Sequence, residues 1–164
     1  MTEVSHAHRG MSLEAALDFV HELYWNRQKI LVRHYGVTGK WIRGRKGPRF
    51  VAFKKALQPP DYDGCIEGRK ICFDAKSVKN KTRWRLDARY EHQWQRLRDW
   101  SAAKAIAFFA VESALRQTLY LYRIWPYSPW PAFKFVDAPC AEILAVKDEG
   151  GFYDWLAAIE EDWL

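Results

Sequence analysis

The sequence contains no apolar run that approaches the roughly 20 residues of a membrane-spanning helix. Its longest run without a polar side chain, residues 105–111, has the length of a buried strand. The first residues carry no apolar segment of the signal-peptide type either. We therefore expect a cytoplasmic protein that has no membrane partner.

Cysteine is scarce. The three cysteines, Cys65, Cys72 and Cys140, are odd in number, and no two of them have CxxC spacing. Neither a disulfide framework nor a zinc site is indicated, and small core thiols in a reducing compartment are the expected role. Internal repeats and low-complexity stretches are also missing, which leaves one globular domain as the simplest organisation.

Acidic residues are absent from one long stretch of the chain. Residues 23–60 contain ten Lys or Arg and no Asp or Glu, whereas residues 137–164 contain eight acids and one lysine. The whole chain has a formal net charge of +6. A chain polarised in this way presents one face to a polyanion and turns another face away from it.

Apolar residues make up 49% and charged residues 28% of the 164 residues, as in a globular domain that buries its own core. We expect one domain over residues 1–164, with residues 1–10 as a short mobile arm and residues 36–48 as a loop or protruding hairpin. Hydrophobic periodicity and turn residues predict an α/β fold with a mixed sheet. Helices are expected at 13–26, about 87–104 and about 152–163, and strands at 30–35, 49–55, 65–66, 70–76, 105–111, 119–124 and 142–147.

A short pattern of acids and a lysine carries the chemistry: Pro60-Asp61, followed by Asp74-Ala75-Lys76. On a strand, Asp74 and Lys76 share one face, with Cα atoms about 6.5–7 Å apart, and a hairpin of this length brings Asp61 back beside Asp74. A divalent cation relieves the repulsion between two such carboxylates, and oxygen ligands without Cys or His favour Mg²⁺ or Mn²⁺. A neighbouring lysine stabilises a pentacovalent phosphate or orients the attacking water. The alternative is a surface ion pair on a strand edge.

The pattern matches the PD-(D/E)xK nuclease signature, and its surroundings resemble the RecU-type Holliday-junction resolvases. Residues 61–82, DYDGCIEGRKICFDAKSVKNKT, correspond to the D-Y-x-G turn, the G-R-x-I-x-F-E-A-K strand and the K-N-K-T segment of that family. His92-Gln93 matches its H-Q pair, and Arg9-Gly10-Met11-x-Leu13-Glu14 matches the R-G-M-x-L-E run at its first helix. The resemblance covers about residues 9–125.

The resemblance implies a restriction-endonuclease-like fold with a basic stalk at about residues 33–55. It implies a homodimeric, Mg²⁺-dependent endonuclease, with Mn²⁺ as a substitute, that cuts four-way DNA junctions by paired symmetric nicks during recombination and repair. No organic cofactor is expected. The host compartment is the bacterial cytoplasm or a phage-infected cell, and the short arm and compact protrusion are typical of a phage-encoded member.

Site residues are carried over position by position. The implied metal ligands are Asp61, Asp74, the Ala75 carbonyl and Glu14, and the implied catalytic residues are Lys76, Asp61, Asp74, Glu14 and Gln93. Glu14 is alternatively a solvated helix carboxylate, and Gln93 a helix-surface amide. The implied DNA-binding residues are Arg9 of the arm, Lys40, Trp41, Arg43, Arg45, Lys46 and Arg49 of the stalk, and Lys79, Lys81, Arg83 and Arg85 after the catalytic strand. Trp41 and Ile42 either wedge against unstacked bases or pack on each other or on the dimer partner.

The chain also departs from the family pattern. Asp74 replaces the usual Glu, Cys72 and Ser77 stand where family members often carry acids, and little resemblance extends beyond Trp125. Trp84, between arginines, is a further candidate for nucleic-acid contact. Two alternative functions therefore stay open: a related restriction-like or flap nuclease, and a non-catalytic basic DNA-binding protein that assists recombination.

Overall fold

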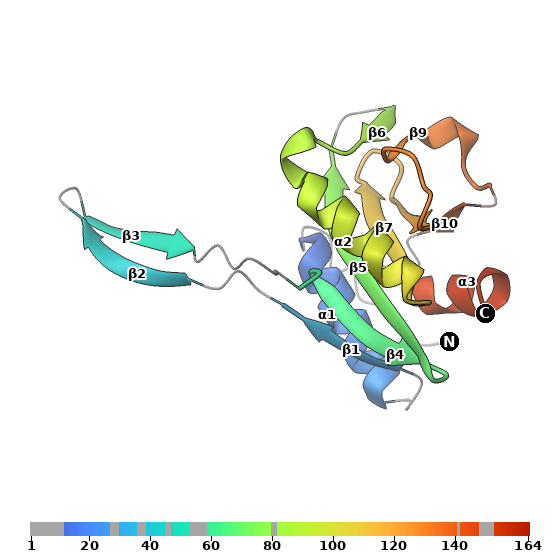
Figure 1. Cartoon of the computed structure of the whole chain (residues 1–164), viewed down its shortest axis with the longest axis horizontal. Coiled ribbons are helices and arrows are strands. Elements are labelled where there is room, and N and C mark those ends of the chain that lie inside the picture. The colour runs from blue at the N-terminus through green and yellow to red at the C-terminus, as the bar shows by residue number, and fades with distance from the viewer. Residues whose placement is uncertain are drawn as a thin grey trace, which may run out of the picture.

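The centre of the molecule is a six-stranded mixed sheet with the strand order β1-β4-β5-β7-β8-β10 (Figure 1). This computed structural model describes residues 12–26, 30–35, 39–44, 47–52, 59–79, 82–140, 142–147 and 153–164. The sheet strands are β1 (Ile30–His34), β4 (Tyr62–Ile66), β5 (Arg69–Val78), β7 (Ile106–Ser113), β8 (Thr118–Ile124) and β10 (Ile143–Lys147). Neighbouring strands are antiparallel except β5 and β7, which are parallel. The expectation of an α/β fold with a mixed sheet is therefore confirmed.

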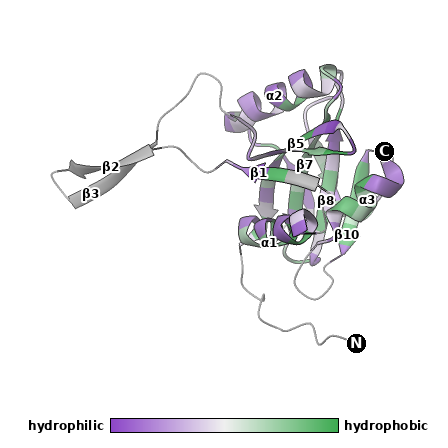
Figure 2. Cartoon of the chain, turned by 90° about the horizontal axis from the view of Figure 1, so that it is seen from below, coloured by the Kyte–Doolittle hydropathy of each residue, from purple (hydrophilic) through white to green (hydrophobic). Residues whose placement is uncertain are grey.

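Helices cover both faces of the sheet (Figure 2). The helix α2 (Glu91–Ala102) lies on one face, and α1 (Leu13–Asn26) and α3 (Trp155–Asp162) lie on the other. Alternating strand residues fill the two cores. Phe73 and Phe108 are buried on the side of α1 and α3, whereas Cys72 and Phe109 are buried on the side of α2.

The first helix has the predicted bounds, Leu13–Asn26. Its apolar residues Leu13, Leu17, Val20 and Tyr24 recur at helical spacing, and all four are buried in the first core. The arm expected at residues 1–10 lies outside the described residues.

The hairpin of β4 and β5 brings together Asp61 and the Asp74-Ala75-Lys76 stretch. Its turn residues Glu67 and Gly68 have positive φ angles of 47° and 77°, the conformation that joins two antiparallel strands most tightly. The resulting register pairs Tyr62 with Phe73. From the end of β5 the chain passes through α2 and returns as β7, parallel to β5. This crossover places α2 over the sheet face that carries Asp74.

A second, separate sheet consists of β2 (Gly39–Gly44) and β3 (Gly47–Ala52). The two strands are antiparallel, with Trp41 opposite Phe50, and Figure 1 shows this hairpin projecting away from the six-stranded sheet. The protruding hairpin that the sequence allowed is thus present, although its second strand begins two residues earlier than the strand expected at 49–55. A projecting hairpin of this kind agrees with the expected stalk, which stays a prediction.

A third sheet was not predicted from the sequence. It pairs β6 (Arg83–Arg85) with β9 (Ala132–Lys134), two strands of three residues each. The long helix expected from residue 87 also divides, because a 3₁₀ turn, η2 (Ala88–Tyr90), capped by Asp87, precedes α2. A second 3₁₀ turn, η3 (Phe135–Asp137), follows β9. Within the described residues, no helix has the length and apolar character to span a bilayer.

Candidate active site

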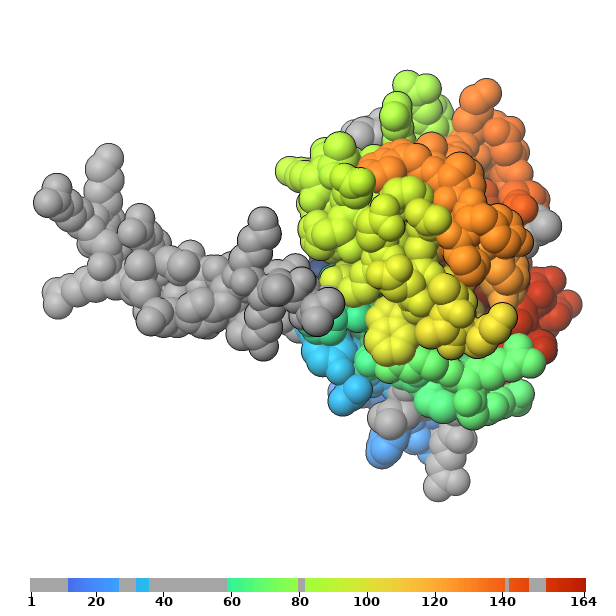
Figure 3. All heavy atoms as spheres, viewed as in Figure 1, coloured from blue at the N-terminus to red at the C-terminus, as the bar shows by residue number. Residues whose placement is uncertain are grey.

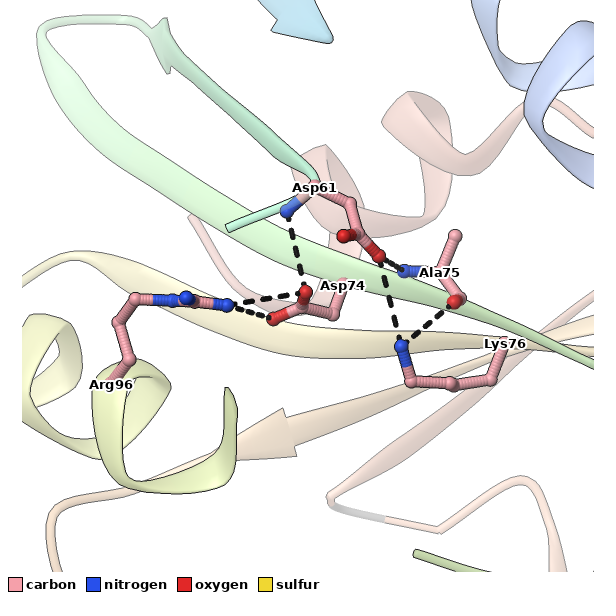
Figure 4. Close-up of polar contacts among 5 residues, drawn as sticks. All are labelled: Asp61, Asp74, Ala75, Lys76 and Arg96. Carbon is pink, nitrogen blue, oxygen red and sulfur yellow. Dashed lines mark hydrogen bonds and ion pairs between the residues drawn. The ribbon is translucent and has the colours of Figure 1, made fainter. Parts of the chain in front are cut away.

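Two carboxylates converge beside the middle of β5 (Figure 4). Asp74 lies on β5 with no exposed surface, and Asp61 directly precedes β4. The Asp61 N–H donates to Asp74 Oδ1 at 3.3 Å, and the Ala75 N–H donates to Asp61 Oδ2 at 3.0 Å. Backbone groups on the two adjacent strands therefore hold both side chains in place. The expectation that the hairpin brings Asp61 beside Asp74 is confirmed.

Lys76 lies on the same face of β5 as Asp74. Its Nζ donates to the Ala75 carbonyl at 3.0 Å and lies 3.7 Å from Asp61 Oδ2. The ammonium also lies over the ring of Tyr90, 5.1 Å from its centroid, which limits the positions that it can adopt. The lysine is thus held beside Asp61, and its role as a phosphate-stabilising cation stays a prediction.

Arg96 is a member of the site that the sequence analysis missed. Its Nη2 donates to both carboxylate oxygens of Asp74, at 3.3 Å to Oδ1 and 3.2 Å to Oδ2. The side chain extends from α2 and keeps 14% of its surface exposed. Arg96 follows Gln93 by three residues, so the two share a helix face. The spacing places Arg96 beside the candidate Gln93, but it does not indicate which residue of the sheet that helix face meets.

The charges of the site oppose one another. Burial raises the pKa of the Asp74 carboxyl well above its usual range, and the nearby charge of Asp61 raises it further. Lys76 and Arg96 act in the opposite direction and lower the same pKa. Two carboxylates and two cations thus balance in charge, but the arrangement leaves Asp74 costly to ionise without a further positive charge.

The donor set fits a hard divalent cation. Asp61 and Asp74 present carboxylate oxygens from adjacent strands, and the Ala75 carbonyl lies beside them. Oxygen donors without thiolate or imidazole are the ligands that Mg²⁺ and Mn²⁺ prefer. In the part of the chain that the structure describes, no third His, Cys, Asp or Glu forms a cluster with these two acids. Of the expected carboxylate ligands, Asp61 and Asp74 therefore lie together as a pair, without a third acid beside them in the described residues.

Glu14 lies on α1, which covers the other face of the sheet. Its carboxylate is exposed, and its backbone carbonyl accepts a hydrogen bond from the Tyr62 hydroxyl at 3.4 Å. Burial raises the pKa of Tyr62, and the carboxylates of Asp18 and Glu14 add to the effect. The structure thus brings Glu14 close to the residue that follows Asp61, and its role as a ligand stays a prediction.

Gln93 lies on α2, one turn before Arg96. Its Oε1 is buried and has no hydrogen-bond partner among the groups that the structure describes. A buried amide oxygen without a partner is costly, and a water molecule is the simplest group to satisfy it. This placement agrees with a residue that orients water, which stays a prediction for Gln93.

The face of β6 and β9 that points outward is basic. Arg83 and Arg85 alternate with Trp84 on β6, and Lys134 is the register partner of Arg83 on β9. All three cationic side chains are exposed, and they line a groove of about 960 Å³ together with aromatic residues and the acid Asp137. Like charges directly opposite each other destabilise a strand pair unless an anion lies between them. Lys134 therefore joins Arg83 and Arg85 as a candidate phosphate contact.

Trp84 is a core residue and not the exposed aromatic side chain that a nucleic-acid contact was expected to need. Only 5% of it is exposed, and it packs with Phe109, Tyr122 and Phe133 in the second core. The alternation of β6 explains the difference, because the residue between two outward arginines must point inward. Because Trp84 stands between two arginines in the sequence, its place in the core was not predicted.

The other predicted DNA-binding residues are described to different extents. Lys79 is exposed just after β5. Strand positions in the β2–β3 hairpin are taken by Lys40, Trp41, Ile42, Arg43 and Arg49, and their side chains lie outside the described part of the molecule. Arg9, Arg45, Lys46 and Lys81 lie outside the described residues altogether.

The segment that follows β8 packs against α2 (Figure 3). In that view α2 is yellow-green and the later segment is orange, and the two lie side by side. Arg98 Nε donates to the Pro126 carbonyl at 2.7 Å, and the rings of Trp94 and Trp130 meet with centroids 5.1 Å apart. These contacts fix the helix that carries Arg96 and Gln93.

A mixed sheet in which adjacent strands bring Asp61 to Asp74-x-Lys76 is the arrangement expected of the PD-(D/E)xK class. The family model "Recombination protein U" matches residues 8–131, so the chain belongs to the Recombination protein U family. It is 32% identical to the Holliday junction resolvase RecU of Bacillus subtilis over 123 residues, which is 71% of this chain and 59% of that protein. It is 24% identical to the Holliday junction resolvase RecU of Staphylococcus saprophyticus over 143 residues, 80% of this chain and 64% of that protein.

The chain therefore spans about three fifths of the length of these curated relatives. A solved structure, the Holliday junction resolvase Hjc of Archaeoglobus fulgidus, matches with 11% identity and a TM-score of 0.40, over 84% of this chain and 89% of that one.

Proposed function

We propose that the chain is a structure-selective DNA endonuclease that resolves four-way junctions by paired symmetric nicks. It depends on Mg²⁺, with Mn²⁺ as a substitute, and acts as a homodimer in recombination and repair in the cytoplasm. One observation carries the proposal: Asp61, Asp74 and Lys76 converge on adjacent strands in a chain of the Recombination protein U family. We infer the four-way junction as the substrate because the relatives in that family are named Holliday junction resolvases.

Asp61, Asp74 and the Ala75 carbonyl would hold the cation. When bound, a divalent ion lowers the pKa of its water and neutralises charge that develops on the phosphate. Because both carboxylates are fixed by backbone N–H groups, they need no rearrangement to face the same point. The same fixed negative charges repel a phosphate as long as no cation neutralises them, which makes cleavage depend on the ion.

Lys76 supplies the protein's own positive charge. An ammonium has three N–H donors, and two of them face the Ala75 carbonyl and Asp61. The Ala75 carbonyl accepts only one of its hydrogen bonds, so the ammonium can also donate to a phosphate oxygen or to the attacking water. Such a contact stabilises negative charge that increases in the transition state.

The basic face of β6 and β9 supports a DNA substrate. Arg83, Arg85 and Lys134 form a row of exposed cations, which suits phosphate oxygens rather than base edges. The projecting β2–β3 hairpin would act as the stalk, and its sequence adds further cations at Lys40 and Arg43. A two-fold dimer would carry two such sites, as paired nicks on a symmetric junction require.

The deciding assay incubates the purified protein with a labelled four-way junction, a Y-fork and a linear duplex, each in Mg²⁺, Mn²⁺ or EDTA. We expect paired nicks on the junction, in either metal and not in EDTA. Asp61→Asn should abolish cleavage and retain binding, whereas Asp99→Asn, an exposed acid on α2, should cleave normally.

Equal cutting of the linear duplex would favour a restriction-like nuclease, and cutting of the fork alone would favour a flap nuclease. Binding of the junction without cleavage under any condition would favour the non-catalytic accessory protein.

A further inference from the structure

Arg96 and Asp74 form an ion pair at the place where the cation is expected. The Arg96 Nη2 lies between both oxygens of Asp74, at 3.3 Å and 3.2 Å. Asp74 has no exposed surface, and 14% of Arg96 is exposed. At this depth the attraction is little screened by water, and removing one partner leaves a buried charge without compensation. The pair is therefore a strong competitor for any other ligand of Asp74.

We propose that Arg96 is the resident counter-ion of the metal site: a divalent cation binds Asp74 as Arg96 leaves it, and the phosphate of bound DNA is the anion that then takes Arg96. The second half of this inference rests on the proposed function, because it needs a DNA substrate. The first half needs only the acids and the arginine. Arg96 thereby couples metal binding to DNA binding.

The charge balance gives the direction of this exchange. Asp61, Asp74, Lys76 and Arg96 together carry two negative and two positive charges. A divalent cation adds two positive charges, so the guanidinium is repelled from the carboxylate that it neutralised before. A phosphate brings one negative charge to the same point, and guanidinium groups bind phosphate with paired hydrogen bonds. Metal and DNA thus each favour the displacement of Arg96 from Asp74.

The positions of the two cations suit this transfer. Figure 4 shows Arg96 and Lys76 on opposite sides of the two carboxylates. A phosphate that approaches the carboxylates therefore meets a cation on each side. Arg96 extends from α2, which the segment after β8 holds through Arg98 and Trp94, so its side chain can turn while the helix stays in place.

The thermodynamic consequence is reciprocal. If DNA removes Arg96 from Asp74, then DNA strengthens metal binding by the same factor by which metal strengthens DNA binding. Coupling between two sites commonly amounts to roughly 5–150-fold. The free protein should bind metal weakly, and loss of Arg96 should raise that affinity and remove the coupling.

The test measures Mn²⁺ binding by isothermal titration calorimetry at pH 8, first without DNA. We expect Arg96→Gln to raise the affinity for Mn²⁺ about tenfold, because the amide no longer carries the charge that opposes the ion. Arg96→Lys keeps the charge and places a single ammonium nearby, so its affinity should rise less. Arg116→Gln removes an exposed arginine from the turn between β7 and β8; it is the matched control and should behave as the wild type. Circular dichroism checks that each variant is folded, and Arg96→Lys decides the outcome if Arg96→Gln does not fold.

The second measurement adds a four-way junction, with every variant in a Lys76→Ala background that slows turnover. The junction should raise the Mn²⁺ affinity of the protein that has Arg96 and leave that of Arg96→Gln almost unchanged. The inference would be overturned if Arg96→Gln leaves the affinity for Mn²⁺ unchanged or lowers it. It would also be overturned if the junction still raises the affinity for Mn²⁺ without Arg96. Because the wild type is assayed for junction cleavage in parallel, a failure of the proposed nuclease function is distinguished from a failure of the exchange.

Discussion

Replacement of Asp74 by Asn should make the metal-free protein more stable while it abolishes cleavage. The carboxylate is completely buried, and Asp61 N–H donates to its Oδ1 at 3.3 Å. The Asn amide oxygen retains this acceptor, but it carries no charge that must be desolvated or that repels Asp61. The substitution therefore removes the two causes that raise the pKa of this carboxyl.

The pH dependence has a definite sign. Because its pKa is raised, the folded protein holds the proton on Asp74 more tightly than the unfolded chain, whose carboxyl titrates near pH 4. The free energy of unfolding therefore falls as pH increases from about 4. The loss is complete once the pH exceeds the raised pKa of the folded state. Asp74→Asn should lack this contribution, so the two proteins should differ little at pH 4 and most at pH 8.

One pKa unit corresponds to about 1.4 kcal/mol. We expect Asp74→Asn to increase the free energy of unfolding by about 1–3 kcal/mol at pH 8 in EDTA. In a domain of this size, that corresponds to a Tm higher by about 2–12 °C. Asp74→Asn also leaves the Arg96 guanidinium without a charged partner. This cost opposes the gain in the free energy of unfolding and sets the lower limit of the expected range.

Thermal and urea unfolding at pH 4, 6 and 8 in EDTA measure this effect. The same scans in excess Mg²⁺ should narrow or reverse the difference, since a bound ion stabilises the wild type by about 2.7 kcal/mol at 100 times its Kd. An Asn variant that is less stable than the wild type at pH 8 in EDTA would refute the reasoning. It would mean that the ion pair with Arg96 outweighs the burial of Asp74.

Three further predictions concern the lysine, the basic face and the core. Lys76→Ala should lower the rate of junction cleavage by at least about 10² in single-turnover assays, with binding retained; an unchanged rate would remove it from the site. Arg83→Gln and Lys134→Gln should each weaken junction binding and reduce the slope of log K against log[salt] by about one, measured by fluorescence anisotropy, whereas unchanged slopes would contradict a phosphate contact. Trp84→Ala should lower the free energy of unfolding by about 3–5 kcal/mol in urea titrations, and a stable variant with weakened DNA binding would instead support an exposed role.

The parts of the molecule that the sequence predicted are those in which the signal is local. The helix Leu13–Asn26 follows from apolar residues at helical spacing, and its bounds agree. The position of Asp61 beside Asp74 follows from period-two alternation and from a short turn at Gly68. In both cases the residues that decide the structure are close together in the sequence, so one sequence suffices.

The parts that it did not predict depend on contacts between distant residues. The pairing of Trp84 with Phe133 joins strands about fifty residues apart in the chain, and each strand has three residues. Such strands are too short for a periodic signal. Arg96 was missed for a related reason: its helix was predicted, but the face of that helix that meets Asp74 depends on how α2 crosses the sheet. No local pattern records that crossing.

The segment after β8 shows how such distant contacts determine the chemistry. Little resemblance to the family was expected beyond Trp125, but the family model extends to residue 131 and includes this segment. Its Pro126 carbonyl accepts a hydrogen bond from Arg98, and Trp130 packs on Trp94. The indole N–H of Trp130 also donates to the Leu86 carbonyl at 3.0 Å, which ties this segment to the chain just before α2. The orientation of α2 sets how Arg96 meets Asp74, so a segment that touches neither carboxylate helps to hold the counter-ion of the site.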